Sequence, residues 1–199
     1  MSDNFNLIQA ELKLPGEKNA VFRCSNVSFS PDQNYVLLGP SGCGKSSFLD
    51  FLQDQSPLVV GRMEKYFAPE IATRIYQDLN LIQNFSILEN AQLDLKTSEE
   101  LRIFSENFKF LGLKMSPQTL ISKLSYGERQ RVAVAKAAAK NTIWILADEP
   151  TSNLDPIHAH LVIECLVKSK KSLIVVTHDH GLKKFFTKVI DFTQWTQHA

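Results

Sequence analysis

The chain has 199 residues, 44% of them hydrophobic and 22% charged, which is the composition of one globular domain with a full core. Its 22 basic and 21 acidic residues leave a net charge of +1, so binding of nucleic acid through bulk positive charge is not expected. No apolar run approaches the roughly 20 residues that span a bilayer, and residues 1–4 lack the pattern of a secretory signal. The three cysteines are far apart in the sequence, which argues against a disulfide framework and fits a reducing cytoplasm.

The first 30 residues predict β-strands, because apolar residues partly alternate over residues 5–14 and Pro15–Gly16 is a turn signal. The apolar run Tyr35–Leu38 ends at a glycine, which is typical of a buried strand in a parallel sheet. A helix is expected next, over Ser46–Gln53.

A helical insertion is expected at about residues 86–118, because this stretch has no strand-like run. Within it, Thr97 and Glu100 form a capping-box pair ahead of apolar residues spaced three and four apart. The alanine-rich segment Glu128–Lys140, which has no glycine or proline, predicts a further helix.

Two more short apolar runs, Ile143–Ala147 and Leu173–Val176, predict buried strands in the second half of the chain. The segment between them has one apolar face over Ile157–Leu166 and predicts a helix. Strands that alternate with helices in this way indicate an α/β domain with a parallel sheet.

The segment after the first buried run matches the pattern G-x-x-x-x-G-K-[ST] in full, between a predicted strand and a predicted helix. Glycines let a backbone wrap a phosphate without Cβ clashes, and successive N–H groups make such a loop positive. The lysine can reach the β- and γ-phosphates, and the hydroxyl after it is a hard oxygen ligand for Mg²⁺. The sequence therefore predicts a nucleotide-phosphate site formed by Gly39, Pro40, Ser41, Gly42, Cys43, Gly44, Lys45, Ser46 and Ser47.

Polar residues follow the two later runs at the edge where ligand chemistry is expected in a parallel sheet. Asp148 and Glu149 end one run, and His178 follows the other. One carboxylate can hold Mg²⁺ while the next orients or deprotonates a water molecule, and the histidine can donate to a γ-phosphate oxygen. An exposed acidic strand end and a structural histidine are the alternatives, which the nearby phosphate loop makes less favourable.

With these residues in place, the chain resembles the ATP-binding-cassette (ABC) ATPases, with motifs in the family's order from Gly39 to His178. The deciding segment is Leu124–Glu128, whose letters LSYGE are a variant of the family signature LSGGQ. Gln77 resembles the Q-loop glutamine of the family, and Ser152–Asp155 resembles its D-loop. The sequence around these loops resembles that of the branch that includes lipoprotein-release, macrolide-export and cell-division ATPases.

The resemblance implies a P-loop NTPase fold built from a RecA-like core with a parallel sheet. It also implies a small N-terminal antiparallel β-subdomain and an α-helical subdomain inserted at about residues 84–125. All of these parts are expected to belong to one ABC ATPase domain that spans residues 1–199.

In mechanism, the resemblance implies that the chain binds and hydrolyses ATP with Mg²⁺. Glu149 is expected to polarise the attacking water, His178 to steady the γ-phosphate, and Gln77 to contact the metal or the water. A second copy is expected to close the open side of the γ-phosphate with its Ser125 and Gly127, in a head-to-tail homodimer. The residues expected to hold the metal are Ser46, Gln77 and Asp148.

Two features depart from the family pattern. Tyr126 and Glu128 replace a glycine and a glutamine of the signature, so either the tyrosine ring points away from a second subunit or the dimer is impaired. No aromatic residue that could stack on adenine occurs near residues 13–15, which leaves Phe5 and Phe22 as candidates for that contact.

The resemblance also implies an integral-membrane permease as a separate chain, with this protein peripheral on the cytoplasmic face of the cell membrane. The segment Leu79–Ile87 is expected to form part of a groove for a helix of that permease, with ordinary packing as the other interpretation. The alternative function is a soluble or regulatory nucleotide-binding module with little turnover and no transport partner. A cassette acting on DNA or ribosomes and a P-loop kinase fit the sequence less well.

Overall fold

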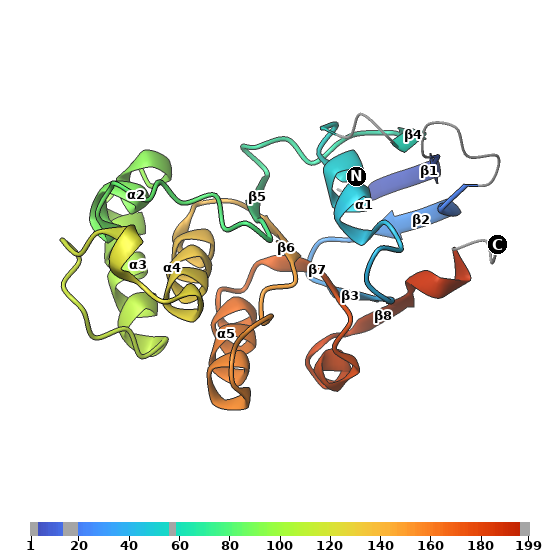
Figure 1. Cartoon of the computed structure of the whole chain (residues 1–199). Helices are drawn as coiled ribbons and strands as arrows, with labels where there is room; N and C mark the ends of the chain where they lie inside the picture. Colours follow the sequence, from blue (N-terminus) through green and yellow to red (C-terminus); the bar gives the residue numbers. More distant parts are fainter. Residues whose placement is uncertain (1–3, 14–19, 56–58, 196–199) are drawn as a thin grey trace.

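Two β-sheets form the strand part of the computed structural model, which describes residues 4–13, 20–55 and 59–195 (Figure 1). The central sheet is parallel and has the strand order β5-β6-β7-β3-β8. Its strands are β3 (Asn34–Leu38), β5 (Ala72–Ile75), β6 (Trp144–Asp148), β7 (Ser172–Thr177) and β8 (Lys188–Asp191). The second sheet is antiparallel, in the order β2-β1-β4, and consists of β1 (Phe5–Leu12), β2 (Phe22–Phe29) and β4 (Val59–Met63).

The buried apolar runs of the sequence form strands β3, β6 and β7, as predicted. Because side chains alternate along a strand, each of these strands contributes to two cores. In β3, Tyr35 and Leu37 pack into an aromatic-rich cluster beneath the antiparallel sheet. Val36 and Leu38 pack into a second cluster with the helices on the opposite face. A parallel sheet covered on both faces requires such continuous apolar runs.

Helices follow the strands as the sequence predicts, with ends that differ by one or two residues from the expected ones. Within the described ranges, three short 3-10 segments cover Ile121–Lys123, His180–Phe185 and Phe192–Gln194. The α-helices are α1 (Lys45–Leu52), α2 (Ile87–Asp94), α3 (Ser98–Phe110), α4 (Tyr126–Ala139) and α5 (Pro156–Lys168). None of the helices in the described part of the chain is long and apolar enough to cross a membrane.

The predicted insertion contains α2 and α3, which lie with α4 at the end of the molecule opposite the antiparallel sheet (Figure 1). Residues 86 and 120 form an isolated antiparallel bridge that brings the two ends of this segment together. The fold predicted from the sequence, a parallel core with a small antiparallel sheet and inserted helices, is confirmed. The turn expected at Pro15–Gly16 lies outside the described residues.

One buried carboxylate joins the insertion to the core. Glu100 accepts hydrogen bonds from the backbone N–H groups of Lys96, Thr97 and Asn141, at 2.8, 2.9 and 2.8 Å. Burial raises the pKa of Glu100, but the donations from Asn141, Thr97 and Lys96 outweigh it and lower this pKa from 4.5 to about 2. The ionised carboxylate therefore stabilises both the start of α3 and the backbone at Asn141, just after α4.

We expect Glu100→Gln to lower the free energy of unfolding at pH 7 by about 2 kcal/mol, because an amide replaces a charged acceptor. The folded pKa lies below the unfolded one, so this contribution is present above about pH 4.5 and is lost as the pH falls toward 2. Urea unfolding at pH 7 and pH 3 measures both effects. The exposed neighbour variant Glu99→Gln is the control, and an equal loss in both variants would contradict the assignment.

Candidate functional site

The loop between β3 and α1 has a backbone that only glycine accommodates at two positions. Gly42 and Gly44 have φ angles of 80° and 95°, in the left-handed region. A Cβ atom at Gly44 would lie 2.8 Å from side-chain carbons of both Leu12 and Phe22. The loop thus passes closely over the antiparallel sheet and ends at the N-terminus of α1, where free N–H groups favour an anion.

Lys45 places a cation over this loop. Its Nζ atom donates to the carbonyl oxygens of Gly39 and Pro40, each at 2.8 Å, and lies 4.0 Å from Oε1 of Glu149. The residue is only 6% exposed. A buried ammonium group held by carbonyl oxygens beside an anion-binding loop is arranged to meet a phosphate.

A hollow of about 380 Å³ brings most of the predicted site residues together. It lies where β3, β5, β6 and β7 end, because the carboxyl ends of parallel strands meet at one edge of the sheet. Its lining includes Ser41, Gly42, Gly44, Lys45, Ser46, Ser47, Gln77, Asp148, Glu149 and His178. The predicted residues Gly39, Pro40, Cys43, Ser125 and Gly127 are not in this lining.

Asp148 and Ser46 provide hard oxygen atoms at the floor of the hollow. Asp148 is 3% exposed, and its Oδ1 atom is buried with no hydrogen-bond partner in the described structure. Burial raises the pKa of Asp148, while the Ser46 hydroxyl and the charge of Arg74 act to lower it. A buried carboxylate oxygen with no partner beside a hydroxyl fits a Mg²⁺ ion.

The side chain of Glu149 is held from the next strand. His178 donates its backbone N–H to Oε1 at 3.0 Å, and its Nδ1 atom lies 2.8 Å from the same oxygen. The Thr177 hydroxyl donates to Oε2 at 2.8 Å. The backbone of Glu149 has a φ of 47°, a strained conformation for a residue with a side chain. Two strand ends thus fix this carboxylate next to the phosphate loop.

The segment Leu124–Glu128 forms the N-terminus of α4. The Ser125 hydroxyl accepts from the backbone of Glu128 and donates to its carboxylate, which in turn accepts from the backbone of Ser125, so the pair forms a capping box. These backbone and hydroxyl donations from Ser125 lower the pKa of Glu128. Glu128 therefore acts as a cap in the place where the family signature has a glutamine.

The family model of the ABC transporter matches residues 22–152. The chain belongs to the ABC transporter family. One relative is the lipoprotein-releasing system ATP-binding protein LolD 1 of Rhodopirellula baltica, which is 31% identical over 84% of this chain and 82% of its own length. The cell division ATP-binding protein FtsE of Mycobacterium tuberculosis is 30% identical over 79% of this chain and 77% of its own.

Solved structures agree with this assignment to the ABC transporter family. The ATP-binding cassette MJ0796, solved as a dimer bound to ADP and Pi, superposes with a TM-score of 0.77 at 26% identity and covers 94% of each chain. An ABC transporter ATP-binding protein from Pyrococcus furiosus has a TM-score of 0.82 at 12% identity, covering 98% of this chain and 100% of its own, which supports the fold alone. As a member of this family, the protein binds and hydrolyses ATP.

Tyr126, which departs from the ABC signature, contacts the Q-loop of its own chain. Its hydroxyl donates to the backbone carbonyl of Gln77 at 2.6 Å. Two and three residues later, Leu79 and Asn80 have φ angles of 67° and 44°, so this loop is strained. The bond therefore ties a strained Q-loop to the start of α4, a contact 49 residues apart that the sequence did not predict.

We expect Tyr126→Phe to lower the free energy of unfolding by about 1 kcal/mol, the usual value of one hydrogen bond. Amide hydrogen exchange in residues 77–80 should become faster, because the strained loop loses its tie. Urea unfolding and exchange measured by mass spectrometry test the two effects. Tyr66→Phe is the matched control, and unchanged exchange in the Tyr126 variant would show that the bond does not hold the loop.

The candidates for stacking on adenine are not available for that contact. Phe5 and Phe22 are 2% and 0% exposed. Phe22 packs edge-on against Phe48 and Phe192 in the aromatic cluster. This expectation was wrong because both rings point into the core rather than toward the hollow, where Leu12 and Val21 are the apolar lining residues instead.

Two polar residues that support the site were not predicted. Gln130, inside α4, donates from Nε2 to the carbonyl oxygen of Glu149 at 3.0 Å. Arg74, on the short strand β5, lies 3.8 Å from Asp148. The sequence signals for these two roles were a glutamine within an alanine-rich helix and an arginine just before the Q-loop. Neither residue lies at a fixed spacing from the phosphate loop, so neither could be assigned to the site from the sequence.

Proposed function

We propose that this ABC ATPase powers a separate membrane permease, and that its ATP sites are completed by head-to-tail dimerisation of two copies. The observation that carries the proposal is the meeting of Lys45, Asp148, Glu149 and His178 around one hollow, while Ser125 and Gly127 lie away from it. A phosphate loop with adjacent acids supplies positioning and charge stabilisation, which phosphoryl transfer mainly needs.

In the proposed mechanism, Glu149 polarises the attacking water and His178 orients the Glu149 carboxylate and steadies the γ-phosphate. Lys45 leaves the loop carbonyls to meet the β- and γ-phosphates, and Gln77 contacts the metal or the water. When bound, Mg²⁺ neutralises charge on the phosphates. Ser46, Asp148 and Gln77 would hold it, and the unpartnered Oδ1 of Asp148 supports this role.

The open side of the hollow supports the dimer. A second hollow of about 560 Å³, lined by Asn153, Asp179 and His180, also includes Glu149 and His178 in its lining. The two hollows therefore meet at the proposed catalytic pair. Ser125 is exposed at the N-terminus of α4. A serine and free N–H groups at this position can contact a phosphate that is bound by the facing copy. The dimeric cassette MJ0796 is consistent with this arrangement.

Exposed apolar side chains support a docking surface for the permease beside the Q-loop. Leu79 and Leu81 are buried, so they belong to the core rather than to a groove surface. Ile82 and Phe85 are 45% and 38% exposed, and Leu93 and Leu120 are also exposed. Such apolar surface fits a partner helix, and we propose that residues 84–125 form one inserted subdomain that carries most of it. We propose that the chain acts on the cytoplasmic face of the membrane.

A cysteine introduced at Ile82 tests the proposal in cell membranes. The three native cysteines are buried, so a thiol crosslinker should react mainly at the new position. We expect a crosslink to an integral membrane protein from Ile82→Cys and none from Val60→Cys, an exposed position on β4. Purified protein should also dimerise when ATP is added to a Glu149→Gln variant. A chain that crosslinks to no membrane protein and hydrolyses little ATP would favour a regulatory nucleotide-binding module.

A further inference from the structure

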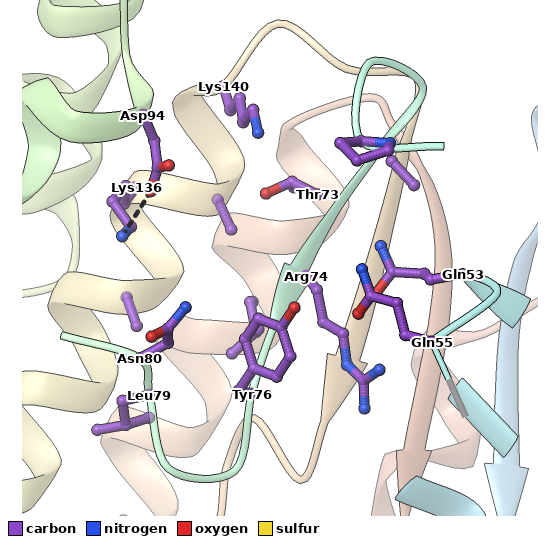
Figure 2. Close-up of a pocket in the computed structure, with 15 residues that line it drawn as sticks. Gln53, Gln55, Thr73, Arg74, Tyr76, Leu79, Asn80, Asp94, Lys136 and Lys140 are labelled. Atoms are coloured by element: carbon purple, nitrogen blue, oxygen red, sulfur yellow. Dashed lines mark ion pairs between the residues drawn. The ribbon is translucent and has the colours of Figure 1, made fainter. Parts of the chain in front are cut away.

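Arg74 is a buried cation between two carboxylates. Its side chain is 3% exposed and lines a pocket beside α4 with Tyr76, Gln53 and Gln55. Figure 2 shows its guanidinium pointing away from the ion pair of Asp94 and Lys136 on the other side of this pocket. The guanidinium also lies over the Tyr76 ring, 4.8 Å from the ring centre. Arg74 is thus fixed by its surroundings rather than free to extend into solvent.

The two ends of the guanidinium contact different acids. Nη1 donates to Oδ1 of Asp50 at 2.5 Å, while Nη2 lies 3.8 Å from Oδ2 of Asp148 and donates to the carbonyl oxygen of Ser46 at 3.3 Å. Asp50 is partly exposed, whereas Asp148 is buried. Arg74 therefore contacts two of the three residues proposed above as metal ligands, Ser46 and Asp148, without occupying the unpartnered Oδ1 of Asp148.

We propose that Arg74, shared between Asp50 and Asp148, sets the metal affinity of the nucleotide site by competing with Mg²⁺ for the charge of Asp148. This inference rests on the proposed role of Asp148 as a metal ligand. A fixed positive charge close to a buried carboxylate compensates that carboxylate when no metal is bound, and it repels a divalent cation that approaches. The Asp50 carboxylate compensates part of the guanidinium charge, so it weakens the competition between Arg74 and Mg²⁺.

The proposal predicts changes of opposite sign at the two residues. Arg74→Gln leaves a buried carboxylate without its counter-charge. The factor by which Mg²⁺ tightens nucleotide binding should therefore be about 10-fold larger than in the wild-type protein. Asp50→Asn leaves Asp148 as the remaining acidic partner of Arg74, so the factor by which Mg²⁺ tightens nucleotide binding should fall by about 3-fold. Arg74→Lys keeps a positive charge at this position and should stay close to the wild-type value.

The measurement is the affinity for a fluorescent ADP, titrated once in EDTA and once in saturating Mg²⁺. The ratio of the two dissociation constants reports the coupling between metal and nucleotide, and the binding of Mg²⁺ to free ADP cancels between variants. ADP excludes hydrolysis from the readout. Arg62→Gln, an exposed arginine on β4, is the charge-matched control and should leave the ratio unchanged.

An Arg74→Gln ratio that falls or stays at the wild-type value in a folded protein would overturn the proposal, since a purely structural arginine gives that result. Should the Arg74 variants not fold, an unchanged ratio in Asp50→Asn overturns it equally. A wild-type protein that binds fluorescent ADP with no effect of Mg²⁺ would instead refute the proposed metal site. The two failures are thereby distinguishable.

Discussion

ATP turnover is expected to fall by about 10² to 10⁴-fold in Glu149→Gln, the range for loss of a general base, while ATP binding persists. The carboxylate lies in the hollow beside Lys45, at the end of β6, and glutamine has the same shape. The His178 backbone N–H can still donate to the amide oxygen of the variant, and the Thr177 hydroxyl, on the other side, can accept from its NH₂ group. The fold should therefore be kept, whereas an amide cannot take up a proton from the attacking water.

Phosphate release at saturating ATP and a binding titration measure the two effects separately. Glu164→Gln, which changes a partly exposed carboxylate on α5, is the control and should hydrolyse ATP at the wild-type rate. Near-normal hydrolysis by Glu149→Gln would show that another group activates the water.

Lys45→Ala is expected to weaken ATP binding by about 10² to 10³-fold, as for the loss of about two charge-assisted hydrogen bonds. The ammonium group is buried and already positioned by the carbonyl oxygens of Gly39 and Pro40. No other lysine or arginine lines the hollow among the residues that the structure describes. The backbone N–H groups of the loop remain in the variant, but the cation proposed to contact the β- and γ-phosphates is lost.

A direct calorimetric titration with ATP tests this prediction, and thermal unfolding without nucleotide checks that the variant is folded. Lys114→Ala, an exposed lysine beyond α3, serves as the control. Wild-type affinity in Lys45→Ala would mean that the loop binds phosphate through its backbone alone, and the proposed movement of Lys45 would then be wrong.

Glu149 and Lys45, the two residues changed in these variants, lie at one edge of the central sheet. The strand order explains why the groups of the proposed site meet at this edge. β3, β6 and β7 are neighbours, so the phosphate loop, Asp148–Glu149 and His178 follow adjacent strands. Hydrogen bonds from Thr177 and His178, at the end of β7, hold the side chain of the proposed base. This preorganisation leaves little rearrangement of the Glu149 side chain to be made when ATP binds.

Much of the fold and of the proposed site could be predicted because the determinants are local in the sequence. A buried parallel strand needs a continuous apolar run, and a phosphate loop needs glycines, a lysine and a hydroxyl at fixed spacing. The positions of Lys45 and Asp148 at strand ends follow from those patterns. The strands β4, β5 and β8 were not predicted, because glycine or charged residues interrupt their short apolar runs.

The tertiary structure decided everything that depends on which side chains face each other. Phe22 was a candidate for adenine and is a core residue, because the register of β2 against β1 turns it inward. Tyr126 reaches the Q-loop 49 residues earlier in the chain, and Arg74 reaches Asp148 across two adjacent strands. Local patterns fix backbone conformation and burial, so the sequence alone determined the fold class and the phosphate loop. Contacts between distant segments depend on strand order and packing, and only the folded chain determined them.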